Sequence, residues 1–206
     1  MNIRLILASI FIPLGIIIAA VPENTTKQYK LTAAELLDEV KDGTQFVSTD
    51  EIADMLVHGD PSLQLIDVRS QAEFEKYNLP GSVNIPLTDI LSDDYEEYLD
   101  QGVKMNVFYS NGNLKANEAW MITRQLGFEN NFVLQGGLNY WAETILNPQA
   151  PKSVMADDEI AKYDFRKGAS AALGGGNEVV SSSNTAKKPK PTIKKRKKKK
   201  RVAGGC

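Results

Sequence analysis

The most reactive side chain in this 206-residue sequence is its single cysteine, Cys206, which is also the last residue. A thiolate is a nucleophile, and neighbouring cations favour the thiolate over the thiol. Cys206 follows two glycines and a Lys-rich run, so two interpretations are open: a mobile thiol carrier, or an incidental cysteine at the end of a solvated charge run. One cysteine cannot form an intramolecular disulfide, so cysteine usage does not indicate the redox compartment.

Charge is distributed very unevenly along the sequence. Eleven of the 24 basic residues lie between Lys187 and Arg201, and the rest of the chain has 13 basic and 26 acidic residues, a formal charge of about −13. The cluster Lys194–Arg201 would be attracted to an anionic membrane surface at about 1 kcal/mol per basic residue. Lys-rich tails also bind nucleic acid, but an exported protein would not meet it, so we do not expect a nucleic-acid partner.

The only histidine, His58, lies beside Gly59-Asp60-Pro61, which is a turn signal. It has no cysteine or second histidine nearby with which to bind a metal ion. We therefore expect His58 to be a surface residue, and we expect neither a metal site nor a cofactor.

Residues 1–21 are expected to deliver the chain to, or across, a membrane. Arg4 precedes an almost wholly apolar run from Leu5 to Val21. As a helix these residues would span about 25 Å at ~1.5 Å each, which is the short end for crossing a bilayer. A basic residue, an apolar stretch and a pair of small residues also suit a secretory signal peptide. A cleaved signal peptide and a retained anchor are both open, and the predicted location is membrane-anchored or exported, on the periplasmic or extracytoplasmic side in a bacterium.

The middle of the chain is predicted to be an α/β domain over 45–146, after a linker and a short helix over 22–44. Capping-box patterns at 32–35, 48–51 and 70–73 predict three helix starts. Further helices are predicted over 87–99, 114–126 and from 136 to 141, and strands over 63–68, 83–85, 105–109 and 131–134. Because strands alternate with helices, we expect a mainly parallel sheet covered on both faces.

The C-terminal part is predicted to fall into two segments. Residues 147–173 form a short extension with a helix over about 157–166. Residues 174–206 consist mostly of Gly, Ser, Asn, Pro and Lys with almost nothing to bury, so we expect a disordered Lys-rich tail that ends in Cys206.

Several motifs, in order over about 100 residues, resemble those of the rhodanese (thiosulfate sulfurtransferase) family. Asp67 and Arg69 match a strand that ends in Asp-x-Arg, residues 79–86 (LPGSVNIP) match a segment of the type IPGAxNIP, and 127–141 match a closing GF…V…LxGG…W pattern. The resemblance implies a single, small three-layer rhodanese-like domain. We interpret Asp67 and Arg69 as a structural ion pair or turn anchor, and Phe74, Ile85, Trp120 and Trp141 as core residues.

The sequence departs from this family at the catalytic position. In rhodaneses the strand before the active-site loop ends at a cysteine, whose thiolate accepts sulfur while loop amides point at it. Alignment on Gly112 places Tyr109 at that position, and a loop that is one residue shorter places Ser110 there. Tyrosine has an unperturbed pKa of about 10 and an oxygen cannot form a persulfide, so we expect no intrinsic rhodanese activity. Ser110, Asn111, Gly112 and Asn113 are a candidate anion-binding loop through their amides.

Two functions follow from the resemblance. The first is sulfur handling or relay by a membrane-associated or exported protein, in which the domain binds a sulfur-donor or acceptor protein or a small sulfur anion and Cys206 is a candidate sulfane-sulfur carrier. The second is a non-catalytic binding or scaffold module whose tail anchors it electrostatically. A sulfurtransferase that uses an atypical residue is the least favoured reading.

Overall fold

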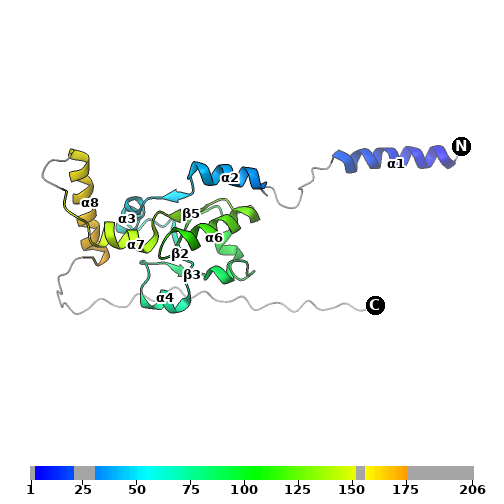
Figure 1. Cartoon of the computed structure of the whole chain (residues 1–206). Helices are drawn as coiled ribbons and strands as arrows, with labels where there is room; N and C mark the ends of the chain where they lie inside the picture. Colours follow the sequence, from blue (N-terminus) through cyan, green and yellow to red (C-terminus); the bar gives the residue numbers. More distant parts are fainter. Residues whose placement is uncertain (1–2, 21–30, 152–155, 176–206) are drawn as a thin grey trace.

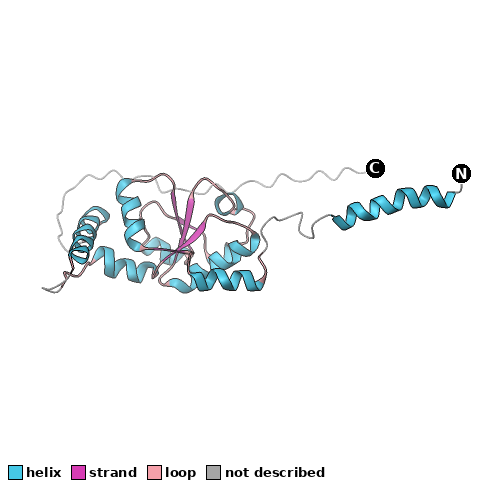
Figure 2. Ribbon diagram, turned by 90° about the horizontal axis from the view of Figure 1, so that it is seen from above, coloured by secondary structure: helices cyan, strands magenta, loops and turns pink. Residues whose placement is uncertain are grey.

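A five-stranded parallel sheet covered by helices on both faces forms the centre of the computed structural model, which describes residues 3–20, 31–151 and 156–175 (Figures 1 and 2). The strand order is β1-β5-β4-β2-β3 and every neighbouring pair is parallel. The strands are β1 Phe46–Val47, β2 Leu63–Asp67, β3 Val83–Asn84, β4 Met105–Tyr109 and β5 Asn131–Leu134. The predicted α/β class and parallel sheet are confirmed.

The helical segments alternate with these strands. They are α1 Ile3–Ala20, α2 Ala33–Asp42, α3 Thr49–His58, α4 Gln71–Lys76, the 3₁₀ turn η1 Leu87–Asp89, α5 Glu96–Leu99, α6 Asn113–Leu126, α7 Gly137–Trp141, the π-helical η2 Ala142–Leu146 and α8 Asp157–Leu173. The predicted cap of α2 is present: the Thr32 hydroxyl accepts from Glu35 N, and the Glu35 carboxylate accepts from Thr32 N. Such reciprocal bonds satisfy amides that have no partner within the helix.

Three elements differ from the sequence-based prediction. The single helix predicted over 87–99 is wrong, because η1 and α5 are separated by a turn in which Ser92 Oγ accepts from Asp94 N and the Ser92 carbonyl accepts from Tyr95 N. Such local bonds compete with a continuous helix. Strand β1 was not predicted, since two residues are too short to show a period. Helix α8 continues seven residues beyond the predicted end at Arg166, to Leu173.

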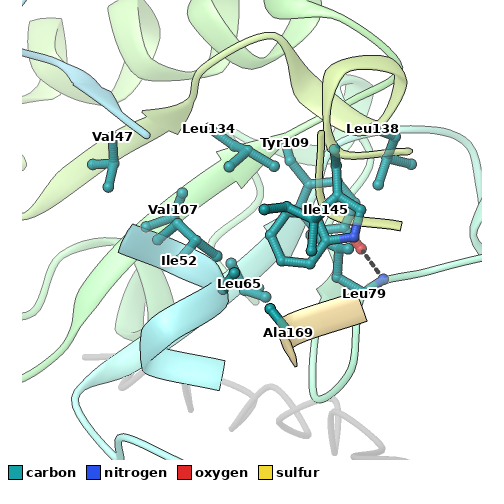
Figure 3. Packing of buried hydrophobic residues seen from close by; sticks show 12 residues of the cluster. Val47, Ile52, Leu65, Leu79, Val107, Tyr109, Leu134, Leu138, Ile145 and Ala169 are labelled. Atoms are coloured by element: carbon teal, nitrogen blue, oxygen red, sulfur yellow. Dashed lines mark hydrogen bonds between the residues drawn. The ribbon is translucent and has the colours of Figure 1, made fainter. Parts of the chain in front are cut away.

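Alternate residues of the central strands supply two hydrophobic cores. Leu65, Val107 and Tyr109 point to the face covered by α3, α7, η2 and α8 (Figure 3). Ile66 and Phe108 point to the opposite face, where they pack with α6 and with residues before and within α5. This alternation places both faces of each strand in the interior.

The predicted core residues are mostly confirmed. Ile85, Trp120 and Trp141 are buried, whereas Phe74 in α4 is only half-buried. The C-terminal helix α8 belongs to the same body as the sheet: Ala169 is buried in the first core, and Arg166 forms a bidentate ion pair with Asp50 in the first turn of α3. The extension after residue 146 therefore adds a helix to one layer of the domain.

The predicted membrane segment and the predicted carrier cysteine lie at the two ends of the chain. Within the part of the chain that the structure describes, no helix is long and apolar enough to cross a membrane. The signal-peptide interpretation of residues 1–21 stays a prediction. Residues 22–30 of the predicted linker, and residues 176–206 with Lys194–Arg201 and Cys206, lie outside the described residues.

Candidate functional site

The candidate site is the loop between β4 and α6, at the carboxyl end of the parallel strands. Open parallel sheets bind ligands at this edge. Tyr109 is the last residue of β4 and is paired in register with Asp67 at the end of β2. The loop itself has only three residues, 110–112, before α6 begins at Asn113.

Tyr109 points away from this edge into the first core and is fully buried. Its hydroxyl donates to Ser82 Oγ at 2.8 Å and accepts from the backbone N–H of Leu79 at 3.2 Å; Figure 3 shows the second of these bonds. Burial raises the pKa of Tyr109 far above its usual value, and the negative charge of Asp67 adds to this rise. The phenol is therefore a neutral core group and cannot supply a nucleophile.

Ser110 is the first loop residue, and its side chain is also hydrogen-bonded within the protein. It is buried, and its Oγ donates to the Gly112 carbonyl at 2.6 Å. A hydroxyl needs an adjacent base to become a nucleophile, and a carbonyl oxygen is not such a base. The only histidine of the sequence, His58, is the last residue of α3. Its exposed ring contacts the Asp54 carbonyl at 2.9 Å.

A buried ion pair fixes the loop from the β2 side. Arg69 Nη2 lies 2.6 Å from Asp67 Oδ2, and Arg69 Nη1 donates to Asn111 Oδ1 at 3.1 Å. Burial acts to lower the pKa of Arg69, but the hydrogen bond and charge of Asp67 outweigh it and raise that pKa. The predicted pair is present, and it additionally holds Asn111, a contact that the sequence analysis did not anticipate.

Asn111 joins this pair to helix α4. Its Nδ2 donates to Glu73 Oε1 at 3.0 Å, and the second carboxylate oxygen of Glu73 accepts from the Ser70 hydroxyl at 2.7 Å. The Ser70 hydrogen bond, followed by that from Asn111, lowers the pKa of Glu73. The side chain of Asn111 is thus engaged at both its oxygen and its nitrogen.

Helix α7 closes the loop from the opposite side. Its amides at Leu138 and Asn139 donate to the carbonyls of Ser110 and Asn111 at 2.9 and 3.0 Å. Gly137 has φ +60°, and a Cβ there would lie 2.6 Å from the Ser110 carbonyl oxygen. Only glycine fits this close approach of the two backbones.

The residues of the predicted anion-binding loop are adjacent, and the polar side chains among them are hydrogen-bonded to other protein groups. Asn113, the fourth predicted residue, accepts from Gly136 N at 2.6 Å through Oδ1. Ser110, Asn111 and Asn113 all bind protein groups. The carbonyls of Ser110 and Asn111 accept hydrogen bonds from α7, and the Gly112 carbonyl accepts the hydrogen bond of the Ser110 hydroxyl.

The outer surface beside the loop carries apolar groups. Leu114, the second residue of α6, is 74% exposed. Tyr77, whose carbonyl accepts from Arg69, is 45% exposed. Burial raises the pKa of Tyr77, and its hydrogen bond with Trp141 opposes this rise. The surface next to the loop thus offers apolar contact area.

The region that contains this site is similar to known proteins. A family model described as a rhodanese-like domain matches residues 48–144. The adenylyltransferase and sulfurtransferase MOCS3 of Drosophila grimshawi is 36% identical over 88 residues, which are 39% of this chain and 19% of that protein. The thiosulfate:glutathione sulfurtransferase of Saccharomyces cerevisiae is 27% identical over 92 residues, 40% of this chain and 66% of that protein.

One solved structure is also similar over part of the chain. The human single-domain sulfurtransferase TSTD1 aligns with a TM-score of 0.41 at 23% identity, over 48% of this chain and 96% of that chain. The matched region spans about a fifth of the MOCS3 relative and slightly under two thirds of the yeast protein.

Proposed function

Residues 48–144 belong to the rhodanese-like domain family, and from this premise we propose that the chain takes part in sulfur transfer without a nucleophile in its own β4–α6 loop. One observation carries the second half of this proposal. The two residues that can occupy the catalytic position are a buried phenol and a serine bonded to a carbonyl. Neither side chain can hold a persulfide sulfur.

The proposed sulfur carrier is Cys206, the only thiol of the sequence. Its thiolate would attack the sulfane sulfur of a donor such as thiosulfate. The new bond joins the cysteine sulfur to the sulfane sulfur, and sulfite leaves with the electron pair of the broken S–S bond, so no external oxidant is needed. As a random coil, the 33 residues 174–206 would reach roughly 30 Å, which would bring Cys206 to the loop or to a bound partner at high effective concentration.

The proposed role of the domain is to bind the donor or acceptor. Leu114 and Tyr77 supply apolar contact area beside the loop. The network of Arg69, Asn111 and Glu73 holds the loop through hydrogen bonds from two other segments of the chain. Residues 1–21 would place this domain on or beyond a membrane, with the Lys-rich tail against anionic lipid.

The same observations favour one second candidate, a non-catalytic binding module. A loop whose side chains are bonded to one another, next to an exposed leucine, suits recognition of a protein surface. In that case Cys206 has no sulfur-carrying role, and the tail serves only as an electrostatic anchor.

The mass of the intact protein separates the two candidates. The full chain is incubated with thiosulfate or a persulfide donor, and the carrier proposal expects a gain of about 32 Da per sulfur that cyanide or a reductant reverses, as for other reversible thiol modifications. The gain should be absent in Cys206→Ser and kept in Ser110→Ala. A gain that persists in Cys206→Ser refutes the carrier role, and no gain with either donor leaves the binding module.

A further inference from the structure

A shallow pocket with an apolar floor and an acidic rim lies at the end of α6 that is remote from the loop. Its volume is about 150 Å³. Ile90, Leu126 and Phe128 contribute apolar lining, and Asp93 and Glu96 contribute carboxylates. We call this feature the acidic groove. Leu126 is the last residue of α6, whereas the β4–α6 loop precedes its first residue.

The segment that supplies most of the groove lining carries only negative charge. Residues 77–103 contain six acidic residues and no basic residue. Asp93 and Glu96 are exposed, and neither takes part in the ion pairs found among the described residues. Leu91, which also lines the groove, is 65% exposed. An exposed apolar surface with an acidic rim fits a cationic segment that also carries an apolar side chain.

The chain itself contains a segment of this chemistry. Residues 187–201 read KKPKPTIKKRKKKKR and hold eleven basic residues around one large apolar residue, Ile193. Lysine stems can cover apolar surface while their ammonium groups reach carboxylates. We propose that this segment docks on the acidic groove of its own chain, with Ile193 in the pocket and flanking lysines on Asp93 and Glu96.

The length of the chain after α8 permits this docking. Seventeen residues, 176–192, separate the described part from Ile193, and they extend to at most about 56–61 Å at ~3.3–3.6 Å per residue. A compact body of roughly 140 residues has a radius of gyration of about 14 Å. The segment can therefore reach the acidic groove from the end of α8.

Docking would have a consequence for Cys206. Thirteen residues lead from Ile193 to Cys206, and they extend to at most about 43–47 Å at ~3.3–3.6 Å per residue. Helix α6 has 14 residues and is about 21 Å long at ~1.5 Å per residue, and the loop lies at its other end. The docked state would therefore keep the thiol tethered within reach of both ends of α6, and an anionic surface that competes for the lysines would release the segment. The docking itself does not require Cys206 to carry sulfur.

Cys206 also provides the test, because a nitroxide label on the only cysteine needs no engineered site. Paramagnetic broadening of backbone amide signals is measured on the full chain at 0.1 M salt and at 1 M salt. We expect broadening at residues 90–96 and 126–128. It should fall by more than half in the double variant Asp93→Asn/Glu96→Gln and at 1 M salt, where the screening length drops from about 10 Å to about 3 Å.

The matched control removes two exposed carboxylates elsewhere. Glu118 and Glu143 are exposed and do not line the groove, so Glu118→Gln/Glu143→Gln should keep the broadening. Ile193→Ser should reduce it at unchanged charge. The docking proposal is overturned by absent or evenly spread broadening, or by equal loss in both double variants. Broadening that arises only between a labelled and an unlabelled copy would overturn it in favour of a second chain as the occupant.

Discussion

Replacing Tyr109 with phenylalanine tests whether this position serves the core. The change removes only the hydroxyl, which donates to Ser82 Oγ and accepts from the buried Leu79 N–H. Two lost hydrogen bonds are worth about 1 kcal/mol each, and a buried N–H left without an acceptor costs about 1–3 kcal/mol. Because these terms overlap, we expect the free energy of unfolding to fall by about 2–3 kcal/mol, and Tm by about 5–10 °C.

Urea denaturation gives this value directly, since a lower midpoint at an unchanged m-value reports a change in stability alone. Tyr98→Phe is the matched control, because within the described residues the Tyr98 side chain makes no hydrogen bond and only its carbonyl accepts. It should change stability by less than about 0.5 kcal/mol. A Tyr109→Phe protein as stable as the Tyr98→Phe protein would refute the core role of the phenol.

The pH dependence of stability of the wild-type and Tyr109→Phe proteins supplies a second check. Burial raises the pKa of Tyr109 in the folded state, while an unfolded tyrosine titrates near pH 10. Above about pH 10 the unfolded chain loses this proton and the folded chain keeps it, so wild-type stability falls by up to about 1.4 kcal/mol per pH unit. Tyr109→Phe lacks this group, and its deficit should shrink between about pH 10 and 11. A constant gap over that range contradicts the reasoning.

Three further changes probe the loop and its supports. Asp67→Asn leaves Arg69 buried without its anionic partner and should cost about 3–5 kcal/mol, measured by urea denaturation. Ser110→Cys should give a thiol with slow iodoacetamide alkylation and no thiosulfate sulfurtransferase activity, because the neighbouring Gly112 carbonyl disfavours a thiolate. Gly137→Ala forces a Cβ against the loop at positive φ and should cost at least about 1–3 kcal/mol, with raised amide hydrogen exchange in α7.

Each of these changes has a control in the same chain. Asp38→Asn breaks an exposed ion pair with Lys41 and should cost less than about 0.5 kcal/mol. Gly168→Ala lies in α8 with open space around the new methyl group and should be neutral or stabilising. An active Ser110→Cys enzyme would show that the loop needs only a thiol, and an Asp67→Asn protein as stable as Asp38→Asn would contradict the structural role of the pair.

Local patterns in the sequence were enough to predict most elements. Strands β4 and β5 have the predicted bounds, and the helix starts at Thr32, Ser48 and Ser70 follow from capping residues. What could not be predicted depends on distant contacts. Strand β1 exists because Phe46 and Val47 extend the sheet edge at β5, and two residues carry no period of their own.

The site shows the same division between local and distant information. The buried pair of Asp67 and Arg69 could be predicted because its members are two residues apart and resemble a known motif. The bonds of Asn111 to Arg69 and Glu73 cross 42 and 38 residues of sequence. The identity of a loop asparagine does not specify such partners, so the sequence suggested an open loop of amides where the structure has an internally bonded one.

The way the loop is held bears on what it can do. The ion pair of Arg69, the bridge of Asn111 to Glu73 and the close approach of Gly137 each constrain it from a different element. These contacts are made within the protein and fix the backbone of the loop from three sides. What it offers to another molecule is then its outer surface, where Leu114 is exposed. Sulfur chemistry in this chain would therefore divide between a domain that binds and a thiol, Cys206, that lies elsewhere in the sequence.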